Sequence, residues 1–186
     1  MRIWIRHSAR GMNTKVLFLV GVAASMFAEN SANAADLEQR LFSAEDETLT
    51  RPASIPSEVT AMLAQDSDVK DALTDEHLGP DAVPSSWFLA SEIHLRNARE
   101  KDLIVVAKGP LMGANVTIFL IFRPGDLRYE LLLKAPAHTM AVKSARSNGY
   151  EDVELWSATA ITESSVLCRF DAGAYRLSTR NSKPIR

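Results

Sequence analysis

Two stretches decide the fold of this chain, RSNGYEDV at residues 146–153 and RFDAGAY at residues 169–175. Each of them joins a turn to a strand. Asn148-Gly149 tolerates the positive φ that a tight hairpin needs, and Asp171 with Gly173 supplies the same chemistry at the second turn. Both places therefore predict reversals between antiparallel strands, and we expect the C-terminal half to be a β-meander.

Outward from these turns, alternation of apolar and polar residues predicts further strands. The alternation starts at Trp87, whereas residues 103–107 are apolar on both faces and predict a central strand. The predicted strands lie near residues 87–95, 103–107, 116–122, 128–134, 139–144, 152–157, 164–170 and 174–178. Because only short links separate these segments, we expect one sheet that is antiparallel throughout.

Two short amphipathic helices are predicted before the strands. Ile55, Val59 and Met62 have helical spacing, and a second helix is expected to begin with Ser67 as its N-cap and to end at Gly79-Pro80. The predicted fold class is therefore α+β, with an N-terminal helical hairpin packed on an antiparallel β-meander of about seven to eight strands.

The first 34 residues have the charge order of a secretory signal peptide. They carry four basic residues and one acidic residue, and an apolar run at residues 16–27 is followed by Ala32-Asn33-Ala34. That run is too short for a membrane-spanning helix, which needs roughly 20 residues. We expect cleavage after Ala34 and a periplasmic or secreted protein without a stable membrane anchor. Met12 precedes a compact signal of the same kind and is an alternative start.

The only cysteine, Cys168, lies far downstream of the signal, so neither lipid attachment after the apolar run nor an internal disulfide is expected. Cleavage would leave 152 residues with 17 basic and 22 acidic side chains, which suits one domain and argues against a nucleic-acid partner. The polar composition of residues 35–56 predicts a flexible tether, and residues 57–180 are expected to form the single α+β domain.

The two opening stretches also carry a resemblance. The pattern Asn148-Gly149-Tyr150-x-Asp152 followed by Arg169-Phe170-Asp171 and Tyr175 is similar to one found in small exported bacterial proteins of unknown function. The resemblance covers about residues 103–178 and implies export without implying an activity. In that pattern a glycine directly follows the last aspartate, whereas here Ala172 intervenes.

No cofactor is predicted. Asn148, Gly149 and Asp152 resemble part of a calcium loop, but the first two ligand positions fall on Ser144 and Arg146, and the fixed positive charge of an arginine opposes a calcium ion. We therefore expect a metal-free hairpin turn.

A possible catalytic pair lies on the first predicted strand. Glu92 and His94 share one strand face, where they can act as an acid and a base. With one of the late aspartates, Asp152 or Asp171, they define an alternative function as a small envelope hydrolase. The sequence shows no order of catalytic residues, so a solvent-exposed strand face is the favoured interpretation.

Trp156 and Tyr150 form the other candidate surface. If Val153 and Leu155 point inward, Trp156 points to the opposite face. It then lies with the acidic Glu154 and Asp152, where it can receive a sugar ring or a cationic partner. The favoured expectation is that the helical hairpin covers Trp156. The predicted function is a non-enzymatic binding or inhibitory module for an envelope protein or a glycan.

Overall fold

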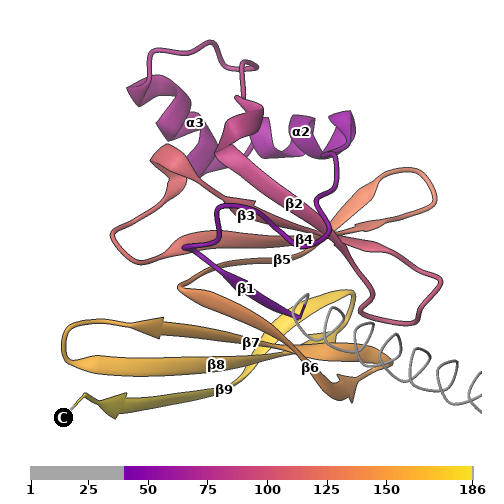
Figure 1. The fold of residues 1–186 in the computed structure, drawn as a ribbon. Helices are drawn as coiled ribbons and strands as arrows, with labels where there is room; N and C mark the ends of the chain where they lie inside the picture. Colours follow the sequence, from indigo (N-terminus) through magenta and orange to yellow (C-terminus); the bar gives the residue numbers. More distant parts are fainter. Residues whose placement is uncertain (1–39, 186) are drawn as a thin grey trace, which may run out of the picture. The chain divides into compact units, whose positions relative to one another are not determined.

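A computed structural model of the chain describes residues 40–185 (Figure 1). The predicted signal peptide and residues 35–39 of the predicted tether lie outside this part of the chain. None of the helices in residues 40–185 has the length and apolar character to cross a membrane.

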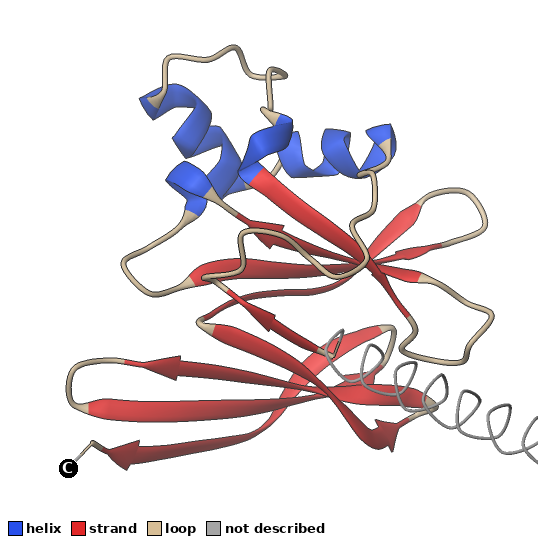
Figure 2. Ribbon diagram, viewed as in Figure 1, coloured by secondary structure: helices blue, strands red, loops and turns tan. Residues whose placement is uncertain are grey.

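The described residues form two antiparallel sheets (Figure 2). The inner sheet has the order β2-β3-β4-β5 and contains β2 (Phe88–Ile93), β3 (Asp102–Ala107), β4 (Thr117–Pro124) and β5 (Tyr129–Ala137). The open sheet has the order β1-β6-β7-β8-β9 and contains β1 (Leu41–Ser43), β6 (Thr139–Ser147), β7 (Tyr150–Ala158), β8 (Thr162–Asp171) and β9 (Ala174–Pro184). The predicted antiparallel arrangement is confirmed.

The prediction of a single sheet is wrong, because the chain changes sheets between β5 and β6. The link is His138 alone, whose N–H donates to the carbonyl of Trp156 in the open sheet. Because this link is as short as a hairpin turn, its length in the sequence does not show that the chain passes from one sheet to the other. The physical reason is burial, since β3 and β4 are apolar on both faces and the second sheet covers one of those faces.

The core between the two sheets is apolar. Most of its residues come from strands, and its largest fully buried members are Leu95, Ile104, Val106, Phe119, Ile121, Leu132, Met140 and Val153. Each such aliphatic or aromatic side chain contributes roughly 1.5–3 kcal/mol when it is fully buried. The free Cys168 lies in this core as a small apolar residue.

Two helices, α2 (Ser57–Ala64) and α3 (Ser67–Asp75), cover the other face of the inner sheet (Figures 1 and 2). Their buried side chains, including Val59, Leu63 and Val69, pack with strand residues in a second apolar cluster. Two short 3₁₀ turns, η1 (Ser85–Trp87) and η2 (Gly109–Leu111), add Trp87 and Leu111 to the same cluster. The inner sheet is therefore covered on both sides.

The ends of α3 differ from the predicted ones. Asp66, and not Ser67, is the N-cap residue, and its carboxylate accepts a hydrogen bond from the backbone N–H of Asp68. At the other end His77 takes a φ of 57°, and the N–H of Leu78 donates to the carbonyl of Leu73. His77 thus has the left-handed backbone conformation that commonly ends a helix, and the helix stops before Gly79-Pro80.

Residues 40–56, which were predicted to be part of a flexible tether, are attached to the domain. Strand β1 pairs with β6 through Leu41↔Ala141, and Phe42 is only 2% exposed. Arg40 forms an ion pair with Glu151 at 2.6 Å. One buried aromatic side chain and a strand partner thus hold a segment that is polar overall. At the other end of the chain β9 continues to Pro184, beyond the predicted limit at residue 180.

Both decisive turns are two-residue reversals. Asn148 and Gly149 have φ of 49° and 83° and join β6 to β7. At the second turn the positive φ values belong to Ala172 at 46° and Gly173 at 89°, while Asp171 is the last strand residue before them. The intervening alanine therefore occupies the position that asparagine holds in the first turn.

Candidate functional site

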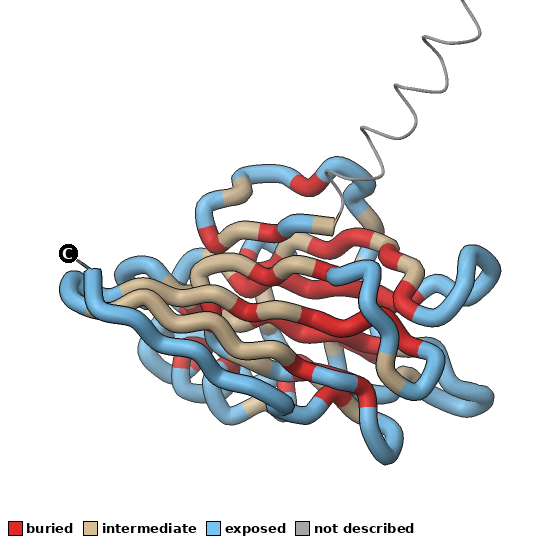
Figure 3. Tube along the Cα trace, turned by 90° about the horizontal axis from the view of Figure 1, so that it is seen from below, coloured by how far each residue is buried: buried red, intermediate tan, exposed pale blue. Residues whose placement is uncertain are grey.

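Within residues 40–185, no helix covers the outer face of the open sheet. Figure 3 looks at the molecule from below Figure 1 and shows β6 to β9 with no helix in front of them. Trp156 lies on this face, because its neighbour Leu155 belongs to the core and successive strand residues point to opposite faces. The helices cannot cover Trp156 as expected, since they pack on the inner sheet, which is a different sheet.

Trp156 forms one wall of a shallow hollow of about 280 Å³. Its direct cross-strand neighbours are Thr139 on β6 and Ser165 on β8. The His138 ring meets the indole edge to face, with 5.4 Å between the ring centroids. The remaining wall is polar and includes Glu154, Glu163, Ser164, Asn181 and Lys183. The hollow thus combines one half-buried aromatic face with hydroxyl, amide and carboxylate groups.

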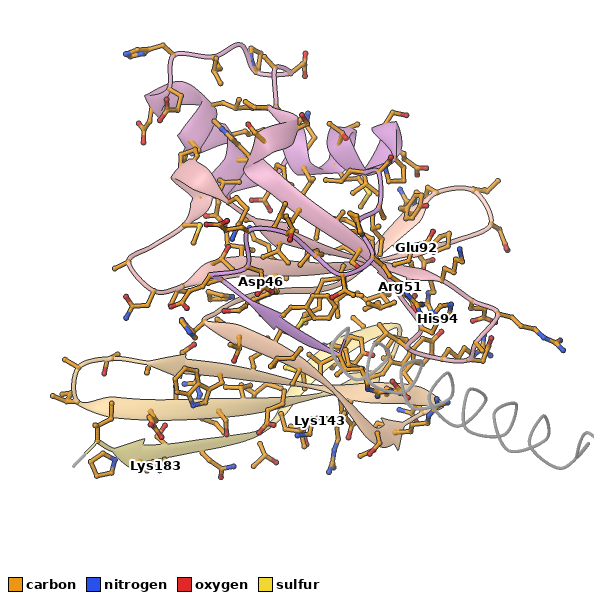
Figure 4. All side chains as sticks on the ribbon, viewed as in Figure 1. Asp46, Arg51, Glu92, His94, Lys143 and Lys183 are labelled. Carbon is orange, nitrogen blue, oxygen red and sulfur yellow. The ribbon has the colours of Figure 1, made fainter. Side chains whose placement is uncertain are left out.

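The charges around the hollow are paired. Lys143 lies 3.0 Å from Glu154, and Lys183 lies 2.8 Å from Glu163. Figure 4 labels both lysines on the open sheet. The hydrogen bond to Glu163 raises the pKa of Lys183. Because each carboxylate has its own counter-ion, the hollow has little net charge to attract a cationic partner.

Asp152 was predicted to extend this surface, but it is only 3% exposed. One carboxylate oxygen lies 3.7 Å from Nε of Arg169. The other oxygen, Oδ1, has no hydrogen-bond partner within residues 40–185. Asp152 therefore positions an arginine at the end of the open face and is not itself an exposed acid beside the indole.

Tyr150, predicted to belong to the same surface, is instead buried with 4% exposure. Its ring stacks on Phe170 with 3.8 Å between centroids, and Arg123 lies over the ring and donates to its hydroxyl. The register between β6 and β7 shifts between Val142 and Arg146, so strict alternation does not carry from Trp156 back to Tyr150.

Glu92 and His94 lie close together at one end of the inner sheet (Figure 4). Glu92 is on β2 and its carboxylate lies 2.6 Å from the Lys101 ammonium, while His94 follows the last residue of the strand. Glu92 borders a hollow of about 470 Å³ that Arg51 and Tyr129 also line. The glutamate is therefore engaged in an ion pair at the mouth of that hollow.

The late aspartates do not join this pair. Asp152 and Asp171 belong to β7 and β8 of the open sheet, and neither lines the hollow beside Glu92. In the part of the chain that the structure describes, no group of three or more His, Cys, Asp and Glu side chains is placed to hold a metal ion. Glu92 and the two late aspartates thus lie on different sheets.

The structure adds site residues that sequence reasoning missed. Ser165 and Asn181 pair directly with each other, and Ser165 pairs with Trp156, so three strands place these side chains in one row. Finding them from sequence requires the register of two consecutive hairpins. That register depends on the lengths of the loops at residues 159–161 and 172–173, because the loop length of a hairpin sets which residues pair.

Comparison with known proteins adds no further constraint to this geometry: no protein-family model, no curated protein and no solved structure matches the chain.

Proposed function

We propose that the protein is an exported, non-enzymatic binding module of the bacterial envelope that holds a glycan on the outer face of its open sheet. The observation that carries the proposal is the half-buried Trp156 in a shallow, polar hollow that no described helix covers. In this proposal residues 1–34 are removed on export, and the mature chain acts in the periplasm or after secretion.

The chemistry of the hollow suits a sugar ring. An indole offers a flat apolar surface to the C–H face of a pyranose, and polar groups around it fix the orientation of the ligand. Ser165 and Asn181 lie beside the indole and offer one hydroxyl and one amide. The paired charges of Glu154 and Glu163 provide acceptors without a net field. This balance favours a sugar ring over a cationic protein as the occupant of the hollow.

The position of the helices supports the proposal, because they cover the inner sheet and not the open sheet. Helices α2 and α3 pack on the apolar face of the inner sheet that is turned away from the inter-sheet core. Among the described residues, the open sheet then offers a broad face without a helix on it. An envelope protein as the occupant of that face is an outcome of the test below.

The test compares Trp156→Ala with the unchanged protein. Binding to peptidoglycan sacculi is measured by sedimentation, and binding to soluble neutral oligosaccharides by calorimetry. We expect Trp156→Ala to weaken binding by roughly tenfold, because an aromatic stacking contact is worth about 0.5–1.5 kcal/mol beyond its buried area. Trp156→Phe should retain part of the affinity. The melting curve should change little, since the indole lies outside the inter-sheet core.

Leu127→Ala is the matched control. Leu127 is the most exposed large apolar residue described, at 97%, and lies on the loop between β4 and β5. Its loss should leave glycan binding unchanged. Equal binding by Trp156→Ala and the unchanged protein would refute the proposal, as would capture of an envelope protein through Trp156 without affinity for any glycan.

A further inference from the structure

We propose that the glycan bound by the open sheet carries an anionic group, a carboxylate, and that this group binds Arg169 and Arg176. The inference rests on the proposed function and adds the chemical class of the ligand. It starts from the register of the last hairpin, in which Arg169 on β8 stands directly opposite Arg176 on β9.

Both arginines lie on the same face as Trp156. The residues beside them in sequence, Phe170 and Tyr175, are buried in the inter-sheet core. Because successive strand residues point to opposite faces, the two arginine side chains point to the outer face of the open sheet. Both residues are exposed.

This pair of like charges is unusual on the open sheet. Directly opposed like charges in a sheet destabilise it. The lysines of the same face, Lys143 and Lys183, each have an acidic partner within 3.0 Å, whereas Arg176 forms no ion pair within residues 40–185. A row that keeps two cations side by side is suited to an anion that binds both.

Asp152 holds the guanidinium of Arg169 through its Nε atom and leaves the terminal nitrogens for a ligand. Its carboxylate lies 3.7 Å from Nε, and within residues 40–185 the two terminal nitrogens of the guanidinium form no hydrogen bond or ion pair. Those nitrogens form the fork that binds a carboxylate through two parallel hydrogen bonds. Asp152 is almost fully buried, and its carboxylate contacts only one of the two arginines.

The spacing decides the kind of ligand. Ser165 is the direct neighbour of Trp156, and Arg169 lies four residues further along β8. At about 3.4 Å per residue, the arginine row is roughly 13–14 Å from the indole row. A single sugar cannot span this distance, so the ligand is an oligosaccharide with one ring over Trp156 and a carboxylate further along the chain.

The experiment uses two matched probes, an oligouronate and the same oligomer with its carboxyl groups reduced to alcohols. We expect the unchanged protein to bind the oligouronate roughly tenfold more tightly, because charge-assisted hydrogen bonds from arginine to a carboxylate are stronger than neutral ones and are only partly screened by salt. Arg176→Gln should abolish this preference and leave binding of the reduced oligomer unchanged.

Arg180→Gln is the control, because Arg180 is an exposed arginine of the same strand that pairs with Val166, a residue packed against the core side. This variant should keep the preference for the oligouronate. A melting curve verifies folding, and removing one of two opposed cations should not lower stability. Equal affinity of the unchanged protein for both oligomers, or equal losses in the two variants, would overturn the inference.

The outcomes separate this inference from the proposed function. Binding of both oligomers that requires Trp156 and shows no acidic preference retains the glycan module and overturns the arginine site. Binding of the oligouronate that requires Arg176 but not Trp156 supports the arginine site and overturns the indole platform. Failure of the unchanged protein to bind either oligomer overturns both.

Discussion

Replacing Asp102 by asparagine should stabilise the protein at neutral pH. Asp102 is the first residue of β3, is 2% exposed, and accepts a hydrogen bond from the N–H of Leu95 at 3.3 Å. Burial raises the pKa of its carboxyl from 3.8 to about 6, and the hydrogen bond from Leu95 and the charge of Arg123 limit the rise. The ionised carboxylate therefore lowers the free energy of unfolding at neutral pH.

The sign and size follow from proton linkage. A raised pKa means that the folded state binds the proton more tightly than the unfolded state, so stability falls as pH rises from about 4 to about 6. Each pKa unit corresponds to about 1.4 kcal/mol, so the penalty at neutral pH is roughly 3 kcal/mol. Asparagine removes the charge, and its amide oxygen can still accept the hydrogen bond from Leu95.

The assay is urea denaturation followed by tryptophan fluorescence between pH 4.5 and 8. We expect the difference in unfolding free energy between Asp102→Asn and the unchanged protein to grow with pH and to reach about 1–3 kcal/mol above pH 7. Asp81→Asn is the control, because Asp81 is exposed. A difference that is independent of pH, or an asparagine variant that is less stable at pH 7.5, would refute the reasoning.

Three further changes test the turns and the alternative site. Gly149→Val should lower stability by about 1 kcal/mol or more, because a β-branched residue is strained at a φ of 83°; an unchanged melting temperature would contradict the turn. Ala172→Asn should raise stability by up to about 1 kcal/mol, since asparagine tolerates the positive φ that Asn148 already adopts; urea denaturation at neutral pH measures this, and a loss would count against it. Glu92→Gln combined with His94→Gln should leave both the melting curve and glycan binding intact, whereas loss of an envelope phenotype with an intact melting curve would favour the hydrolase.

The sequence by itself determined the strands and the turns, because their signals are local. Residues 103–107 are apolar on both faces, and this pattern correctly predicted a strand buried on both sides. Asn148-Gly149 placed the reversal between β6 and β7 because few other residue pairs tolerate two successive positive φ values. Each of these conclusions needs only a few neighbouring residues.

Tertiary structure alone decided which strands share a sheet. β1 pairs with β6 through Leu41 and Ala141, which are one hundred residues apart. The polar composition of residues 35–56 gave no sign of that pairing. The corner at His138 has the length of an ordinary turn. Sheet membership depends on which apolar faces can cover one another, and this is a property of the whole assembled core.

The candidate site depends on which strands share a sheet. The sequence placed Trp156 opposite Val153 and Leu155, but it could not say whether the helices would cover it. They do not, because the inner sheet offers them an apolar face of its own. The cross-strand neighbours of Trp156 and the facing of Arg169 on Arg176 likewise follow from register, which is fixed only when the strands pair in three dimensions.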